Sequence, residues 1–173
     1  NTPIRMAWSR KEDIRNDFFR PAIAAQFRGV IQDAKAVLVD GKIAGPSVFH
    51  ISSLRQQGSI SPGPDRLHVE GAADQPYSIP NFRIAGYLTD IDVPLGFWRS
   101  VGASANGFIL DTFIDELAHA ASTDPLQFRL DLARSEHGPS ASVIEAVREM
   151  SAWTGNTPDG IGRGVAFTHS FGT

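Results

Sequence analysis

The sequence of 173 residues contains no cysteine, so disulfide bonds, iron–sulfur ligation and thiol catalysis are excluded within the chain. It also has no apolar run that approaches the roughly 18 residues of a membrane-spanning helix, and we expect no membrane span. Basic residues are not in excess: 16 Lys and Arg face 19 Asp and Glu, and the net charge of −3 argues against nucleic-acid binding. The chain opens without Met and without the apolar segment of a signal peptide, which predicts a piece of a longer polypeptide.

The overall composition is that of an ordinary globular domain, with 42% hydrophobic and 20% charged residues. A chain of this length can bury one good core, and we expect a single domain over residues 1–173. Strand patterns dominate residues 1–90, interrupted by a Gly- and Pro-rich loop at 58–76, and residues 91–173 predict a loop, helices and a final strand. This order indicates an α+β fold with an antiparallel or mixed sheet and helices packed on it.

The N-terminal half carries the pattern of an antiparallel meander. Asp40-Gly41 has the composition of a hairpin turn, Ser47 that of a helix N-cap, and Pro80 that of a strand entry. The elements expected there are strands at 4–8, 21–30, 35–44 and 77–88, a helical turn or two at 10–17, and a helix at 47–57.

Helical periodicity takes over in the C-terminal half. Asp124 and Pro125 suit the N-cap and first position of a helix that Gly138-Pro139 ends. The other elements expected there are helices at 103–121 and 140–153 and a final strand at 160–171.

The loop before the first of these helices is the sharpest candidate site. Arg99 lies between aromatic residues and the start of the helix, where unpaired N–H groups and a guanidinium together suit a phosphate or an oxyanion. The alternative is a structural arginine paired with Asp90 or Asp92, with Trp98 in the core. The small residues from Gly102 onward permit close backbone approach, but they form no recognised nucleotide-binding motif.

Acidic residues on the same helix offer a weaker candidate. Asp111, Asp115 and His119 are each four apart and can share a helix face, as metal ligands do. A solvated or salt-bridged helix face is the favoured interpretation, and the remaining histidines have no metal-like spacing. We therefore expect no metal ligand and no catalytic residue within the chain.

Three segments together resemble a known family. They are the opening WSRKEDIRNDFFRPA, the central stretch that contains GFWRSVG, FIDELA and DPLQFRL, and the ending GRGVAFTHSFGT. They occur in the same order as in the family. They resemble the large, molybdenum-binding subunit of the molybdenum hydroxylases, the xanthine dehydrogenase and aldehyde oxidase superfamily, and are most similar to the isoquinoline 1-oxidoreductase beta subunit. The chain departs from the family at Lys11, where an acidic residue is usual, at Val101, where a substrate-facing Phe is common, and at 102–107, where Gly-Pro-Gln is common.

The resemblance implies that the chain is an internal fragment of a larger molybdopterin-binding domain. It implies that Arg99, Trp98, Ser100 and Gly102 contact a molybdenum–molybdopterin cofactor, in its cytosine dinucleotide form, and that Val101 faces the substrate. The parent enzyme would oxidise an N-heterocyclic aromatic or an aldehyde with oxygen from water. Its catalytic glutamate would lie outside this chain, so the isolated fragment would be inactive.

The resemblance also implies a small 2Fe-2S partner subunit, and it leaves the compartment open between bacterial cytoplasm and periplasm. Neither the substrate nor the oligomeric state follows from the sequence. A hypothesis of a different class is a non-catalytic interaction or scaffold module, in which the long loop and the amphipathic helices bind a partner protein.

Overall fold

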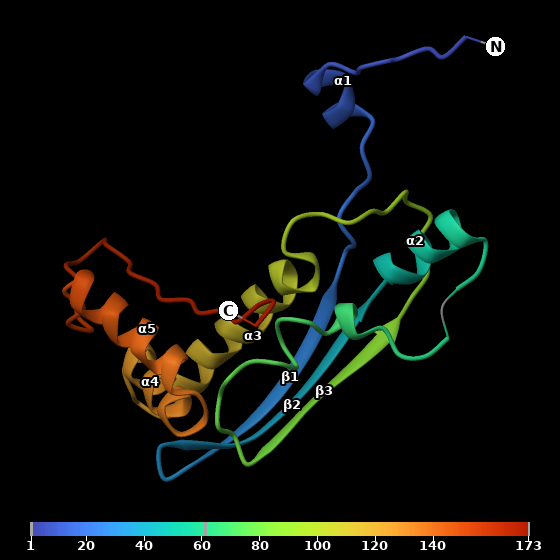
Figure 1. Cartoon of the computed structure of the whole chain (residues 1–173). Coiled ribbons are helices and arrows are strands. Elements are labelled where there is room, and N and C mark those ends of the chain that lie inside the picture. Colours follow the sequence, from blue (N-terminus) through green and yellow to red (C-terminus); the bar gives the residue numbers. More distant parts are fainter. Residues whose placement is uncertain (1, 61, 173) are drawn as a thin grey trace.

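The computed structural model describes residues 2–60 and 62–172 of the chain, with a sheet in the N-terminal half and helices after it (Figure 1). This confirms the predicted α+β class. In chain order the elements are α1 (Arg10–Arg15), β1 (Ala24–Gln32), β2 (Lys35–Gly45), α2 (Val48–Gln57), the short 3₁₀ helix η1 (Arg66–His68), β3 (Asn81–Leu88), α3 (Val101–Ala120), α4 (Pro125–Glu136) and α5 (Gly138–Met150).

The sheet is mixed, with the strand order β1-β2-β3. β1 and β2 pair antiparallel through a tight turn at Asp33 and Ala34, whose φ angles are 49° and 57°. β3 pairs with β2 in parallel, so the predicted meander is wrong for the third strand. The long connection through α2 and the following loop gives the chain room to return in the same direction.

Asp40-Gly41 lies inside β2, and its prediction as a hairpin turn is wrong. Gly41 is required there because a Cβ atom would lie 2.6 Å from the Phe27 ring and 2.7 Å from Ile84. The glycine therefore marks a close approach of side chains from both neighbouring strands.

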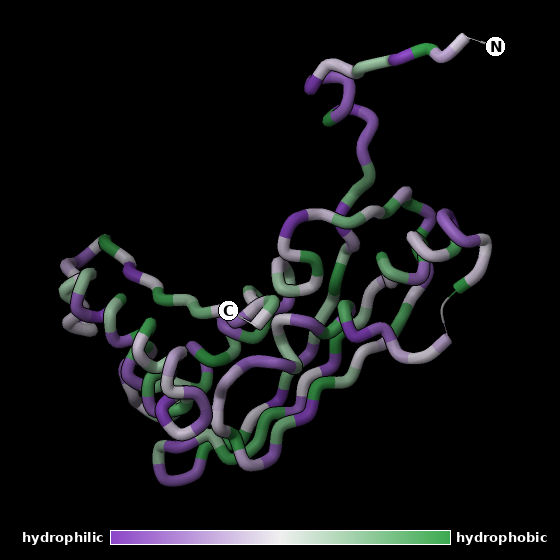
Figure 2. Tube along the Cα trace, viewed as in Figure 1, coloured by the Kyte–Doolittle hydropathy of each residue, from purple (hydrophilic) through white to green (hydrophobic). Residues whose placement is uncertain are grey.

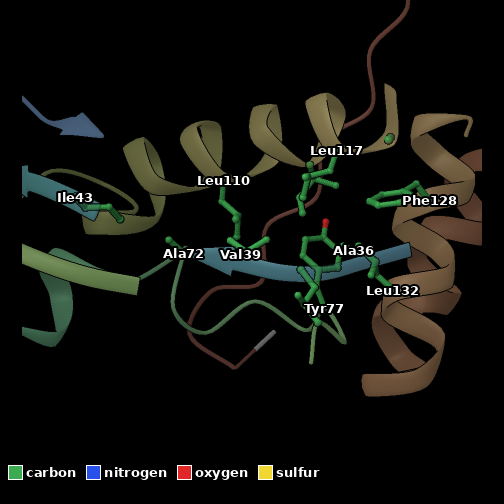
Figure 3. Close-up of a cluster of buried hydrophobic side chains, with 12 residues drawn as sticks. Ala36, Val39, Ile43, Ala72, Tyr77, Leu110, Leu117, Phe128 and Leu132 are labelled. Carbon is green, nitrogen blue, oxygen red and sulfur yellow. The ribbon is translucent and has the colours of Figure 1, made fainter. Parts of the chain in front are cut away.

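The core lies between α3 and one face of the sheet. Leu110 and Leu117 point from α3 toward β2, where Val39 and Ile43 are buried (Figure 3). Complete burial of such side chains contributes roughly 1.5–3 kcal/mol each. A second cluster joins α4 and α5, with Leu126 at its centre. Burial alternates along β2 from Val39 to Gly45, and Figure 2 shows hydrophobic and hydrophilic residues interspersed along the strands.

The two predicted helix N-caps, Ser47 and Asp124, are confirmed. The Ser47 hydroxyl accepts a hydrogen bond from the His50 N–H at 2.9 Å, and the Asp124 carboxylate accepts one from the Gln127 N–H at 2.9 Å. Gly138-Pro139 opens α5 directly, because Pro suits the first turn of a helix as well as the end of the preceding one.

Two predicted strands are wrong. Residues 4–8 form an extended arm that leaves the body together with α1, and Ile4, Met6 and Trp8 are exposed on it (Figure 1). Residues 160–171 have no regular structure and run back toward the start of α3. None of the helices in the described part of the chain has both the length and the apolar composition needed to cross a bilayer.

Candidate functional site

The loop between β3 and α3 ends in a strained turn. Ser100 and Val101 have φ angles of 70° and 41°, in the left-handed region that β-branched residues avoid. Such residues cost about 1–3 kcal/mol each, and they persist only where the surroundings hold them. The Val101 N–H donates to the Trp98 carbonyl oxygen at 3.0 Å and closes the turn. This turn directs neighbouring side chains to different sides of the loop.

Three of the predicted site residues line one small apolar cavity of about 50 Å³: Trp98, Val101 and Gly102. Phe97 of the same loop and Phe49 of α2 also line it. Val101, predicted to face the substrate, therefore lines a partly open and largely apolar space. Trp98 is 40% exposed, so the alternative that placed it in the core is wrong.

Arg99 and Ser100 line a second, more open hollow. Ser104 lines both spaces, and the C-terminal segment adds Thr168 and Ser170 to the second one. Its polar lining consists of a guanidinium and hydroxyl groups, without a carboxylate from the described residues. This set of donors suits an anionic or carbonyl-rich ligand such as a phosphate or a pterin.

The Arg99 side chain is exposed, and its guanidinium forms no hydrogen bond or ion pair with residues 2–60 or 62–172. The predicted alternative, a structural pair with Asp90 or Asp92, is therefore not formed. A guanidinium keeps its charge at any physiological pH and can bind an oxyanion through two N–H groups.

The N-terminus of α3 already contains an internal anion. The backbone N–H of Gly102 lies near the Glu70 carboxylate and favours its ionised form, and the Oε2 atom of Glu70 is buried with no hydrogen-bond partner in the described part of the chain. Burial raises the pKa of Glu70, the nearby Asp74 carboxylate raises it further, and the Gly102 N–H opposes both. A Cβ atom on Gly102 would lie 2.1 Å from the Leu67 carbonyl oxygen, so only glycine fits. The side chains of Arg99 and Ser100, rather than this N–H, are thus the donors that face the hollow.

The acidic residues of α3 form an ion pair with a buried arginine. Arg129 of α4 has a fully buried side chain and contacts Asp111 at 3.0 Å and Asp115 at 2.6 Å. Tyr77 donates to Asp111 at 3.1 Å, and burial raises the pKa of that phenol. Of the two predicted alternatives for this helix face, the salt-bridged one is confirmed and the solvated one is wrong for Asp111, which is buried. No group of three potential metal ligands occurs among the described residues.

The C-terminal segment is held in place by side chains from two distant elements. The Phe167 N–H donates to Asp111 Oδ2 at 3.0 Å. The Gln75 side chain accepts from the His169 N–H at 2.9 Å and donates to the His169 carbonyl oxygen at 3.1 Å. A Cβ atom on Gly107 would lie 2.6 Å from Thr168 Oγ1, so the segment lies directly on α3. No local pattern in the sequence indicates these contacts.

The family model described as "Molybdopterin cofactor-binding domain" matches residues 1–132. The beta subunit of isoquinoline 1-oxidoreductase from Brevundimonas diminuta is 25% identical over 179 residues, which cover 95% of this chain and 21% of that protein. A nicotinate dehydrogenase subunit from Pseudomonas putida is 26% identical over 164 residues, which cover 90% of this chain and 13% of the relative. The chain thus spans about a fifth or less of the length of these curated relatives.

Solved structures show the same fold. Aldehyde oxidoreductase from Desulfovibrio gigas superposes with a TM-score of 0.57 and 18% identity, over 76% of this chain and 15% of that one. The aldehyde oxidoreductase from Desulfovibrio desulfuricans gives a TM-score of 0.56 and 16% identity, over 77% and 15% of the two chains.

Proposed function

Because the chain belongs to the molybdopterin cofactor-binding domain family, we propose that it is part of the large subunit of a molybdenum-dependent oxidoreductase. The family match confirms the resemblance that the sequence motifs indicated. The proposed reaction oxidises an N-heterocyclic aromatic or an aldehyde with oxygen from water. The names of the relatives, which refer to isoquinoline, nicotinate and aldehyde oxidation, support this substrate class.

The observation that carries the proposal is the exposed guanidinium of Arg99, which has no partner among the described residues and lines a hollow with hydroxyl donors. The residues present fit an anionic pterin: Arg99 and Ser100 would hold its phosphate or carbonyl oxygens, and Trp98 would support the loop from the neighbouring cavity. When bound, the cofactor supplies a two-electron redox centre and the transfer of water-derived oxygen. The chain's own residues bind and orient it.

Val101 and the aromatic residues beside it have a separate task in this proposal. They line the apolar cavity that adjoins the hollow, and they exclude water from the substrate's side of the loop. Val101 is smaller than the Phe common in the family, so we propose a site without an aromatic sandwich around the substrate.

Further parts of the proposal concern the complete enzyme. The absence of cysteine places the iron–sulfur ligands on another chain or segment. Two of the relatives are themselves named as single subunits of larger enzymes, which supports a small 2Fe-2S partner. The catalytic base would lie beyond this chain, and the isolated segment would be inactive. The cytosine dinucleotide form of the cofactor is tested by release of CMP when the purified enzyme is hydrolysed.

Arg99→Ala in the complete enzyme tests the proposal. We expect turnover to fall about 100-fold or more, as when one preorganised donor is removed from an active site, together with a loss of bound molybdenum. The unfolding midpoint should stay close to that of wild type, because the side chain is exposed. Arg15→Ala, an exposed arginine of α1, is the matched control. Unchanged turnover and molybdenum content would contradict the role of Arg99 and favour the scaffold hypothesis.

A further inference from the structure

The segment that precedes β1 lies against the loop that carries Arg99. The Phe19 N–H donates to the Pro94 carbonyl oxygen at 2.9 Å, and the Gly96 N–H donates back to the Phe19 carbonyl oxygen at 3.2 Å. Gly96 permits this approach, because a Cβ atom there would lie 2.6 Å from Phe18 Cβ. The two segments, which are far apart in the sequence, are therefore joined as a short parallel bridge.

Arg20 extends this contact to the end of the loop. Its Nη2 donates to the Arg99 carbonyl oxygen at 2.9 Å, and its guanidinium lies 5.7 Å from the centre of the Trp98 ring. The Trp98 indole N–H in turn donates to the Phe18 carbonyl oxygen at 2.6 Å. Arg20 thus contacts both the backbone and the aromatic side chain of the loop, while the Arg99 guanidinium lines the hollow.

Arg55 of α2 holds the other end of the same loop. Its Nη1 donates to the Leu95 carbonyl oxygen at 3.2 Å, and its guanidinium stacks over the Phe18 ring at 3.9 Å. Its Nη2 also lies 3.3 Å from Ser52 Oγ, which fixes the arginine on its own helix. Leu95 itself is fully buried, so this anchor point is firmly packed.

These contacts lie directly before the strained turn. The Arg99 carbonyl that Arg20 binds belongs to the peptide that leads into Ser100, and Ser100 and Val101 have the positive φ angles. A turn of this kind relaxes unless neighbouring groups hold it, and hydrogen bonds from charged donors are among the strongest available.

We propose that Arg20 and Arg55 are positioning residues for the cofactor loop. They hold the strained turn, so that Arg99 faces the polar hollow and Val101 faces the apolar cavity. This role rests on the proposed function, because a fixed loop matters for activity only if the loop binds the cofactor. Arg20 also lines the apolar cavity, but the proposed role of both arginines acts through the backbone of the loop.

Hydrogen–deuterium exchange in the complete enzyme tests the restraint independently of activity. The probe is the peptide 94–102, which includes the bonded N–H groups of Gly96 and Val101. We expect about tenfold or faster exchange in Arg20→Met, in line with the loss of a charge-assisted hydrogen bond, and unchanged exchange in α4. Arg20→Lys keeps a charged donor and should restore slow exchange. Arg55→Met should loosen the same peptide, and Arg15→Met is the matched control.

The molybdenum content of the same samples shows whether the restraint serves the cofactor. We expect Arg20→Met to retain several-fold less molybdenum than Arg15→Met, with Arg20→Lys close to wild type. Exchange in Arg20→Met equal to the control would overturn the restraint. Faster exchange with full molybdenum content would overturn the positioning role if Arg99→Ala loses the metal. If Arg99→Ala also keeps it, the proposed function fails while the restraint stands.

Discussion

At the start of α3, Glu70 places a carboxylate where a helix has unpaired N–H groups. The contact with the Gly102 N–H favours the ionised form, but burial and Asp74 disfavour it more strongly, so the pKa of Glu70 is raised. Glu70 thus lies at the start of the helix beneath the loop that carries Arg99, and it carries a charge that burial opposes.

These opposing effects predict that Glu70→Gln raises the stability of the folded protein by an amount that depends on pH. The pKa in the folded protein lies above the ordinary value of 4.5, so the native state binds the proton more tightly than the unfolded chain does. Stability therefore falls as pH rises through the folded pKa, and the penalty is complete above it. Glutamine keeps an acceptor for the Gly102 N–H and carries no charge.

We expect Glu70→Gln to unfold at a higher temperature than wild type near pH 8, with a gain that shrinks toward pH 4. Thermal unfolding followed by circular dichroism measures the unfolding temperature at each pH. Glu116→Gln, which changes an exposed glutamate of α3, should show no such trend. An equal gain at both pH values would mean that ionisation of Glu70 is not its source.

At the scale of elements, α3 and α4 are joined by a charge that is completely buried. Arg129 has no exposed side-chain surface, and Asp111 supplies most of its compensation from inside the core. Asp115 also contacts the guanidinium, but 45% of its side chain is exposed. The two carboxylates should therefore differ in their contribution to stability.

We expect Asp111→Ala to lower the free energy of unfolding by about 3–5 kcal/mol, because it leaves a buried charge without its main partner. Asp115→Ala should cost less, about 1 kcal/mol, because Asp115 is partly exposed and Asp111 still pairs with the buried guanidinium. Urea unfolding measures both losses. In a double-mutant cycle, Asp111→Ala with Arg129→Met should cost less than the sum of the single changes. Equal losses for the two aspartates, or strict additivity, would contradict this account.

Elements whose causes are local were predictable from the sequence. Ser47 and Asp124 mark helix starts through their own backbone contacts, and the paired strands before α2 follow from alternation and a short turn. The strand predicted at residues 160–171 is wrong because the pattern of residues in a segment does not show which groups its backbone will bond to. That segment bonds to the side chains of Asp111 and Gln75 instead of to a neighbouring strand.

At the scale of the whole molecule, the site consists of segments that are far apart in the sequence. Arg99 was identifiable from its aromatic and glycine neighbours. Arg20, Thr168 and Ser170 lie in the segments that carry the family resemblance, but nothing in those segments indicates that they reach the same loop. The role of Glu70 could not be predicted either, because it lies in a Gly- and Pro-rich loop with no regular pattern. These residues meet near the start of α3 because the segment just before β1 and the C-terminal segment both lie beside the loop that carries Arg99. Figure 1 shows the C-terminal segment returning to α3, while the N-terminal arm leaves the body.

Gln75 should control the C-terminal side of the hollow. Its amide bonds both backbone groups of His169, much as a neighbouring strand would. We expect Gln75→Ala to speed deuterium exchange across residues 165–171 about tenfold while the sheet stays protected. Gln26→Ala, which changes an exposed residue of β1, is the control. Equal protection of residues 165–171 in both variants would show that the Gln75–His169 hydrogen bonds do not hold the segment.

The proposed contact between the loop carrying Arg99 and a molybdenum cofactor can be observed directly. The most direct measurement is a crystal structure of the complete enzyme with anomalous difference maps recorded on both sides of the molybdenum absorption edge. We expect a molybdenum peak beside the loop 98–102, with pterin density within hydrogen-bond distance of the Arg99 guanidinium. A molybdenum peak remote from this loop, or pterin density that Arg99 does not contact, would contradict it.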